Sequence, residues 1–423
     1  MLQPGPDALE RMAREKRAAR LDALLEGAAR EFNARGLAGA SLSRIARSVG
    51  LTRAALYYYV KDREALALLA YQRSCERMAQ DLALAEAAED GLGAVTAYLR
   101  AALAPDRPAT AVLSELDALA EPGRTAVAGV HAANVERLRA LIRRGIADGS
   151  IRPCDDEVIA QALVGAVSWA PLSEAWVEGD HTAFRARGAD TLVDMVTLGQ
   201  AADPSQAFVS PVAIEQFFPR PPNAFDREAM SGAKLEQVLM TASQLFNRRG
   251  VAGVSLDDIA AALGATKGAV YHYLDNKTEL VVRCYERAFD LYERFAKAGE
   301  AGRNGLEQGL ISLRLNVLAH ASGLAPLIQM AGADALPAKA RRDLQRRARA
   351  LQVHFHGLAR QGLADGSHRP MDFDTAAEIG AGVFEWLPKW LDPNDPRAAG
   401  AVADEICLLF IAGLKRRNSR VAS

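Results

Sequence analysis

The sequence predicts an all-α protein made of two tandem copies of one unit. One stretch occurs twice, because adding 214 to the numbering places residues 21–71 on 235–285, with 20 of 51 positions identical. A second match, at an offset of 217, relates residues 147–150 to 364–367. Both copies keep a helical, Ala- and Leu-rich pattern without alternating β-branched runs. The period of about 215 residues far exceeds the roughly 20–50 residues of a solenoid repeat, so a whole domain is duplicated.

The composition is that of a globular protein. The 423 residues are 50% apolar and 24% charged, which suits two copies of roughly 200 residues, each large enough to bury a core. No run approaches the roughly 18 uncharged apolar residues of a membrane helix, and the first twenty residues are polar and charged. We therefore expect a cytoplasmic protein.

The first copy opens with a pattern typical of a helix-turn-helix. A long helix is expected over residues 8–34, and Gly36 ends it. Ser41 can cap a second, short helix, and Gly50 allows the left-handed turn that follows. Thr52 then caps a third helix with the sequence TRAALYYYVKDR, and Arg63 opens a longer connecting helix.

The third helix offers groups that suit nucleic acid. Arg53 and Arg63 bracket three consecutive tyrosines, so cations and phenolic donors share one small surface. A packed aromatic patch is the alternative, but Tyr57 and Tyr59 cannot share a helix face with Tyr58. At least one of the three must leave the core, and we expect DNA contact.

The remainder of the first copy predicts a helical body and a linker. Residues 91–199 stay helical between Pro and Gly breaks, and the last two segments, 155–176 and 182–198, are amphipathic and placed to pack against a partner copy. Residues 203–226 contain five prolines, which predicts a semi-rigid linker. Its apolar side chains indicate that it packs along the body.

The second copy repeats this order, with helices expected near 226–248, 257–263 and 267–273, another from Lys277, and a helical body to about 417. Asp258 completes a capping-box pattern with Ser255. We divide the chain into a first head, first body, linker, second head and second body, at residues 8–66, 67–202, 203–226, 227–280 and 281–418.

Both heads resemble the tetracycline-repressor (TetR) family of bacterial transcription regulators. The first copy carries the resemblance in 32–36 (FNARG), 41–46 (SLSRIA), 50–52 (GLT) and 56–60 (LYYYV), together with Arg63. The second copy carries it in 246–250 (FNRRG), 255–260 (SLDDIA), 264–266 (GAT) and 270–274 (VYHYL), together with Lys277. The resemblance implies an all-α homodimer in which the last two body helices form a four-helix interface and each body holds a small-molecule pocket. Since one chain carries both halves here, we expect an intramolecular pseudo-dimer.

The resemblance also implies two sets of DNA-binding residues. Base contacts are expected from Arg53, Ala54, Tyr57, Lys267, Gly268 and Tyr271. Phosphate contacts are expected from Ser41, Thr52, Tyr58, Tyr59, Arg63, Ser255, Thr266, His272, Tyr273 and Lys277. Arg and Lys reach guanine acceptors or phosphate, while small residues allow close approach to the groove.

The two heads differ, which predicts an imperfect palindrome with half-sites about one helical turn, roughly 34–36 Å, apart. Residues 1–66 carry 12 Lys/Arg and 8 Asp/Glu, a balance of +4, whereas residues 227–280 carry 6 of each. The first head should therefore contribute more of the salt-dependent affinity. A vestigial second head, favoured by Asp257, Asp258 and Asp275, is the alternative.

The expected function is that of a ligand-responsive regulator, a repressor released by a small apolar effector that prefers the conformation that misfits DNA. The alternative is an interaction protein with one or both heads no longer binding DNA. No phosphate loop or nucleophile elbow indicates an enzyme or a cofactor. The i, i+2 spacing of His354 and His356 and the scattered cysteines argue against a metal site, and we expect free thiols. The effector, its pocket residues and any pairing of whole chains are left open.

Overall fold

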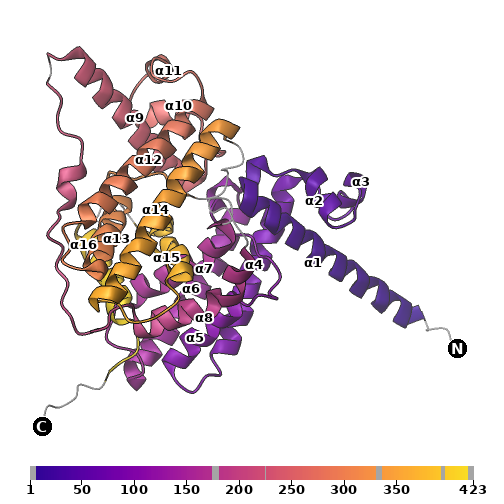
Figure 1. Ribbon diagram of the computed structural model, residues 1–423. Coiled ribbons are helices and arrows are strands. Elements are labelled where there is room, and N and C mark those ends of the chain that lie inside the picture. The colour runs from indigo at the N-terminus through magenta and orange to yellow at the C-terminus, as the bar shows by residue number, and fades with distance from the viewer. Residues whose placement is uncertain (1–5, 174–180, 224, 330–335, 392–395, 418–423) are drawn as a thin grey trace, which may run out of the picture.

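The protein is an assembly of helices in which the two repeats pack side by side. The computed structural model in Figure 1 describes residues 6–173, 181–223, 225–329, 336–391 and 396–417. Within these ranges strand-like pairing is limited to two isolated bridges, Ile151 with Lys415 and Ala201 with His368. The all-α prediction is confirmed. Among the described residues, no helix combines the length and apolar character needed to cross a bilayer.

The two repeats present the same succession of elements. The first contains α1 (Pro6–Gly39), α2 (Leu42–Ser48), α3 (Arg53–Leu56), α4 (Arg63–Ala85), α5 (Gly91–Ala102), η1 (Leu116–Ala118), α6 (Gly123–Asp148), α7 (Asp156–Ser173) and α8 (His181–Leu198). The linker contains η2 (Ile214–Phe217). The second contains α9 (Arg227–Arg249), α10 (Leu256–Ala262), α11 (Lys267–Tyr271), α12 (Lys277–Gly299), α13 (Gly305–His320), α14 (Ala338–Asp365), α15 (Phe373–Glu385), η4 (Leu387–Lys389) and α16 (Pro396–Ala412).

Glycines end the first long helix of each repeat, as the sequence predicts for Gly36. Gly36 has φ 67°, and helical residues resume for only one turn, to Gly39. Gly250 has φ 74° at the end of α9. Residues other than Gly rarely adopt this backbone conformation. Each glycine therefore sets the point at which the chain turns toward its helix-turn-helix.

The linker packs along the second repeat. Phe217 is buried, and its ring meets that of Phe295 edge-on with centroids 4.9 Å apart. The guanidinium carbon of Arg294, a residue of α12, lies 5.0 Å from the centroid of the Phe217 ring. Figure 1 shows the linker passing along the outside of the second repeat, beside α16 and α13. The apolar linker residues thus fix the path between the repeats.

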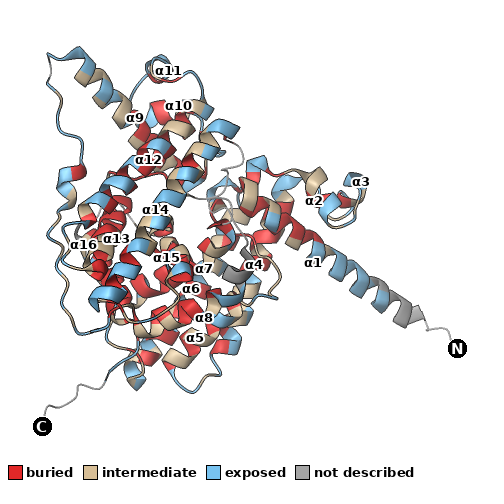
Figure 2. Cartoon of the chain, in the orientation of Figure 1, coloured by how far each residue is buried: buried red, intermediate tan, exposed pale blue. Residues whose placement is uncertain are grey.

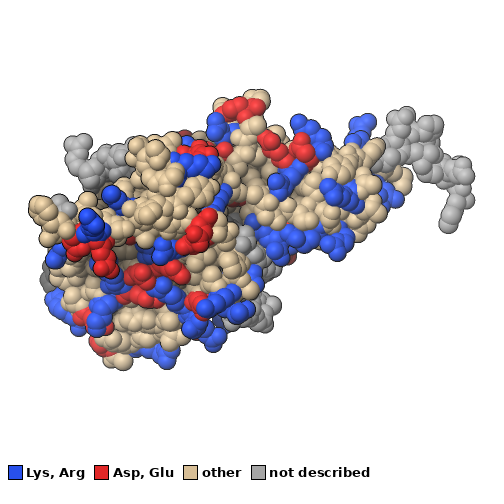
Figure 3. Space-filling view, turned by 90° about the horizontal axis from the view of Figure 1, so that it is seen from above, with Lys and Arg blue, Asp and Glu red and all other residues tan. Residues whose placement is uncertain are grey.

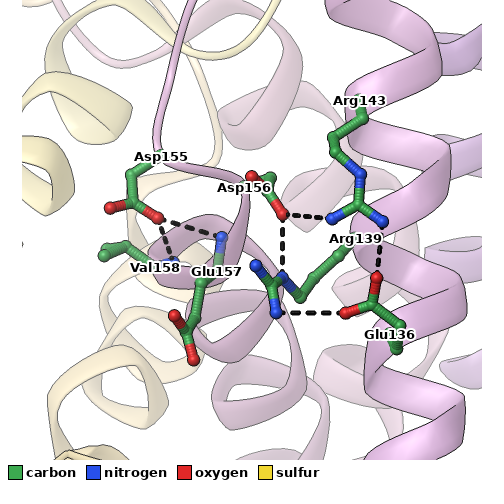
Figure 4. A network of polar contacts seen from close by, with 7 residues as sticks. All are labelled: Glu136, Arg139, Arg143, Asp155, Asp156, Glu157 and Val158. Carbon is green, nitrogen blue, oxygen red and sulfur yellow. Dashed lines mark hydrogen bonds and ion pairs between the residues drawn. The ribbon is translucent and has the colours of Figure 1, made fainter.

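An ionic cluster fixes the corner between α6 and α7 (Figure 4). Asp156 Oδ2 accepts from both Arg139 Nε and Arg143 Nη1 at 2.8 Å. Glu136 accepts from the same two guanidinium groups at 3.0 and 2.5 Å. Asp155 Oδ1 caps the start of α7 by accepting from the backbone N–H of Val158 at 3.1 Å. The pairs are partly exposed, so the cluster contributes mainly by orienting α7.

Helices α7 and α8 of the first body pack against α15 and α16 of the second, and together they form a four-helix interface within one chain. α7 and α15 cross at two glycines, Gly165 and Gly382, which occupy equivalent positions at the offset of 217. A Cβ atom on Gly382 would lie 2.5 Å from the carbonyl oxygen of Gly165. A Cβ atom on Gly165 would overlap the carbonyl oxygen of Gly382 in the same way. Only the absence of side chains allows this approach.

Two arginines at equivalent positions, Arg152 and Arg369, make similar contacts across this interface. Arg152 donates from Nε to the carbonyl of Gly413 at 2.7 Å, and Arg369, 217 positions later, donates to the carbonyl of Gly199 at 2.7 Å. Arg152 also pairs with Glu405 at 2.9 Å, as Arg369 pairs with Asp194 at 2.7 Å. Such reciprocity is the mark of an isologous, two-fold interface. The predicted pseudo-dimer is therefore present in a single chain.

The core follows the same organisation. Buried residues of the first body, second body and second head form one continuous cluster. The first head has a separate cluster that includes Leu24, Ile45 and Leu56, each at most 1% exposed. Figure 2 shows burial concentrated where the bodies meet, whereas the outer part of α1 is exposed. The two bodies therefore share one core, which the second head joins and the first head does not.

Candidate nucleic-acid interface

The first helix-turn-helix forms as its capping residues predict. Ser41 Oγ accepts from the Arg44 N–H at 3.4 Å and starts α2. Gly50 takes φ 69° between the helices, and Thr52 Oγ1 accepts from the Ala55 N–H at 3.1 Å to start α3. Buried Ile45 and Leu56 hold the two helices on the core of the head, which leaves the start of α3 and the following turn in solvent.

Cationic and phenolic groups are exposed together on α3 and the turn after it. Tyr57 is 44% exposed and Tyr58 69%, whereas Tyr59 packs partly against the core. Arg53 Nη2 donates to the Tyr57 hydroxyl at 3.2 Å. The guanidinium carbon of Arg17, on α1, lies 5.0 Å from the centroid of the Tyr58 ring. Such groups can contact phosphates and base edges, and small Ala54 beside them is exposed.

Arg63 and Lys277 occupy equivalent positions and brace equivalent loops. Arg63 Nη1 donates to the carbonyl of Ala38 at 2.5 Å, after the end of the regular part of α1. Lys277 Nζ donates to the carbonyl of Ala252 at 3.5 Å, and burial lowers the pKa of Lys277. Both cations therefore also position the chain that enters each helix-turn-helix.

The second helix-turn-helix has the same geometry and a different charge pattern. Gly264 takes φ 62°, and Ser255 and Asp258 form the predicted capping box. Lys267 Nζ pairs with Asp257 at 3.0 Å, and this hydrogen bond raises the pKa of Lys267. Its ammonium also lies 5.8 Å from the centroid of the Tyr271 ring. An acidic neighbour thus holds the cation that would reach DNA from this head.

The remaining predicted contact residues lie around the same two turns. Gly268 and His272 are exposed, Tyr273 packs partly against the core, and Thr266 precedes α11 without a side-chain capping bond in the described structure. The structure therefore gathers each predicted set around its own helix-turn-helix. In Figure 1 the first head extends to the right of the bodies and the second lies above them.

A basic extension adds to the first head and was not predicted as a site. Residues 11–20 carry five cations and one acid, and most of them are exposed on the outer part of α1. Figure 3 shows Lys and Arg side chains along this extension. The equivalent stretch of the second repeat, residues 225–234, carries two cations and two acids. The contact between Arg17 and Tyr58 joins the extension to the α3 surface.

A buried charged junction lies between the heads, and sequence reasoning also missed it. Glu115, beside η1, accepts from the Leu37 N–H of the first head and lies against Gly36 and Gly250. Lys389, in η4, donates to the carbonyl of Ser114 and, at 2.5 Å, to that of Asn247 in the second head. Burial raises the pKa of Glu115, while burial lowers that of Lys389 to about 8.

A cavity of about 240 Å³ with largely aromatic and aliphatic walls lies in the second body, where it borders Trp169 and Gln200 of the first repeat. Tyr292 and Glu385 line it, and the Tyr292 hydroxyl lies 3.3 Å from both Glu385 Oε1 and His320 Nε2. Burial raises the pKa of Glu385 to about 8 and lowers that of His320 to about 3. Burial therefore favours the uncharged form of both side chains. Within the described ranges, no group of three or more His, Cys, Asp or Glu side chains could hold a metal ion.

Two sequence profiles each match the chain twice. The N-terminal profile of bacterial regulatory proteins of the tetR family matches residues 24–70 and 238–284. The tetracyclin repressor-like C-terminal domain matches residues 92–176 and 314–414. The chain belongs to the TetR family. It is a tandem duplication of the complete TetR unit, and its resemblance to this family is confirmed.

Curated relatives of this TetR-family chain are transcriptional regulators. The repressor KstR2 of Mycolicibacterium smegmatis is 22% identical over 199 residues, which are 45% of this chain and 94% of the relative. The regulator TtgR of Pseudomonas putida is 37% identical over 65 residues, 15% of this chain and 31% of the relative. KstR2 thus corresponds in length to one repeat.

Solved structures of TetR-family regulators align with part of the chain. KstR2 of Mycobacterium tuberculosis is 21% identical, covers 44% of this chain and 96% of its own, and gives a TM-score of 0.39. AibR in complex with isovaleryl coenzyme A and operator DNA is 24% identical, covers 42% and 98%, and gives a TM-score of 0.35.

Proposed function

We propose that this chain is a ligand-responsive repressor that reads an imperfect palindrome with the two heads of a single molecule. The observation that carries the proposal is the reciprocal pairing across the body interface, where Arg152 and Arg369 make equivalent contacts within one chain. Bodies related by a two-fold arrangement would relate their helix-turn-helix units by the same symmetry, as palindromic operators require. One chain therefore supplies what a homodimer of single units would supply.

The heads would contribute unequally to binding. Arg53 lies on a surface that includes the basic extension of α1, whereas Lys267 is paired with Asp257. The first head should supply most of the phosphate contacts and most of the salt dependence. The half-sites would then differ in sequence as well as in affinity, because Ala54 and Tyr58 are replaced by Gly268 and His272.

The aromatic cavity of the second body supports the effector part of the proposal. Ligand sites are mostly apolar with a few polar anchors, and this cavity has both. The effector would release DNA if it binds more tightly to the arrangement of heads that misfits the operator.

The test starts from DNA fragments selected from a random pool with the full chain. Arg53→Ala should weaken binding by about 10- to 100-fold if it contacts a base, since such contacts are worth about 1–3 kcal/mol. Lys267→Ala should weaken binding less. Lys61→Ala, which removes an exposed cation of the first head, serves as the control for loss of charge alone. Unchanged binding by both variants would refute the proposal.

A second candidate function is that of an interaction protein whose second head no longer binds DNA. The pairing of Lys267 with Asp257 favours it. The selected DNA distinguishes the two readings, since a single half-site would support a non-binding second head and a split palindrome would support two reading heads.

A further inference from the structure

The cavity of the second body contains polar atoms that lack partners. Trp169 and Asn316 line it and are 4% and 5% exposed. Trp169 Nε1 and Asn316 Oδ1 have no hydrogen-bond partner among the described residues. A buried donor or acceptor without a partner costs about 1–3 kcal/mol, so a ligand that satisfies both atoms would regain part of this cost.

The walls of the cavity determine the charge of its ligand. They contain no Lys or Arg, and they include two carboxyl groups, those of Glu378 and Glu385, of which Glu385 is 1% exposed. Glu385 Oε2 accepts from the Gln329 N–H at 2.6 Å, and the neighbouring His320 is uncharged near pH 7. An anion would enter without a counter-charge, and burying an unpaired charge is strongly unfavourable.

Repeat one does not reproduce this site. At the offsets of 214 and 217, the positions of Tyr292, Asn316 and Glu385 are occupied by Met78, Ala102 and Ser168. A Cβ atom on Gly309 would meet nothing within 4 Å. The equivalent residue of the first repeat is Val95, which is fully buried.

The space on the first body differs in size and charge. It measures about 1130 Å³ and is lined by the Asp81–Arg107 ion pair and by Arg341. Trp386, the tryptophan equivalent to Trp169, has a hydrogen-bond partner, because its Nε1 donates to Gln161 Oε1 at 3.3 Å. The two bodies therefore present different chemistry to small molecules.

We infer that the chain binds one effector, in the second body, and that this effector is a mostly apolar molecule that bears a hydroxyl group and carries no negative charge. A hydroxyl can accept from Trp169 Nε1 or donate to Asn316 Oδ1, and the aromatic walls bury the rest. That the ligand acts as an effector rests on the proposed function, whereas the binding site is inferred from the geometry of the cavity. Because Trp169 belongs to α7 of the first body, such a ligand would touch both repeats at their interface.

Gly309→Phe and Gly357→Phe provide a matched pair for testing the site. Both glycines lie on helices, α13 and α14, and a Cβ on either meets nothing within 4 Å. Gly309 lines the cavity, whereas Gly357 is exposed and does not. Phe at 309 should fill the cavity, and Phe at 357 should leave it empty.

The experiment is a calorimetric titration of the full chain with 2-naphthol, with smaller phenol and rounder 1-adamantanol as further neutral alcohols. We expect at least one alcohol to bind with one molecule per chain, and Gly309→Phe to weaken it at least tenfold while Gly357→Phe does not. 2-Methoxynaphthalene, which cannot donate, and naphthalene-2-carboxylate, an anion, should bind more weakly than 2-naphthol.

Four results would overturn the inference: no binding by any of the alcohols, two molecules per chain, tighter binding of the carboxylate, or equal binding by Gly309→Phe. Operator binding is measured separately with the same proteins. An alcohol that binds once per chain without releasing DNA would leave the site intact and refute the ligand-responsive repressor. If the unmodified protein does not bind operator DNA even in the absence of an alcohol, the repressor proposal is refuted, whereas the site in the cavity is not.

Discussion

Glu385 is an acid in a place where its charged form is disfavoured. It is 1% exposed and accepts from the Gln329 N–H and from Tyr292. Burial raises its pKa to about 8 from the usual 4.5. The folded protein therefore holds a proton on this group that the unfolded chain releases between about pH 4.5 and pH 8. Across this window, a rise in pH lowers the free energy of unfolding through this group.

Glu385→Gln removes the titration and keeps the shape. Relative to the unmodified protein, its free energy of unfolding should rise steadily from pH 5 to pH 8 and level off above pH 8. Urea unfolding at several pH values measures this difference, with exposed Glu89→Gln as the control. A difference that is flat with pH would contradict the account of Glu385.

Asp257 is a second residue whose effect can be measured alone. It pairs with Lys267 at 3.0 Å, and its equivalent in the first head is Ser43. Asp257→Ser should free the cation and remove a negative charge near DNA, so operator affinity should rise several-fold. The slope of log K against log salt should steepen by about 0.9 if one further phosphate is contacted.

The control for this prediction is Asp404→Ser, which removes the same charge from an exposed position on α16. Fluorescence anisotropy with labelled operator at several salt concentrations reports both quantities. A second head that does not bind DNA would give no change in affinity or slope with Asp257→Ser.

Among the elements, the crossing of α7 and α15 depends on two glycines. Gly382→Ala places a methyl group 2.5 Å from the backbone carbonyl of Gly165, so the helices must separate. Overpacking of this kind costs about 1–3 kcal/mol, which urea unfolding can measure. Gly129→Ala, on α6 with nothing within 4 Å, should instead stabilise by about 0.5–1 kcal/mol. A stabilising Gly382→Ala would mean that the helices do not cross as described.

Local sequence signals predicted the elements and left their assembly incomplete. Gly50, Thr52 and the Ser255–Asp258 box act within a few residues, so they could be read directly as turns and caps. The pairing of equivalent helices followed from the duplication. By contrast, Lys389 meets the Ser114 carbonyl across 275 positions, and no local pattern records that contact. Arg17 was missed because its partner, the Tyr58 ring, becomes a neighbour only when α1 has folded.

In the molecule as a whole, polar contacts extend from the cavity toward both heads. Gln329 donates to Glu385 at the cavity, and its neighbour Ile328 donates to Asn247 Oδ1 of α9 at 3.0 Å. The Asn247 carbonyl accepts from Lys389 at 2.5 Å. Beyond Lys389 lies Glu115, which accepts from the first head. A ligand that shifts Glu385 would therefore act on a junction shared by the heads.

Lys389→Met tests whether this junction holds the heads. It removes the larger of the two positive charges that act on the buried Glu115, those of Lys389 and Arg63, and it leaves the Ser114 and Asn247 carbonyls without this donor. Together these losses should cost about 3–5 kcal/mol in urea unfolding. Adding Glu115→Gln should recover part of the lost stability, because position 115 then carries a neutral amide instead of a carboxylate. Lys61→Met, an exposed side chain, should change stability by less than about 0.5 kcal/mol. Additive effects of the two junction variants would show that the groups act independently.

The central claim is that one chain forms the complete two-headed unit. Light scattering coupled to size exclusion measures the mass of the protein, alone and on its selected operator. We predict one chain of 45.4 kDa in solution and one chain on each split, imperfectly palindromic site. Two chains per site, with the same operator length, would contradict the intramolecular arrangement and require the bodies to pair between molecules.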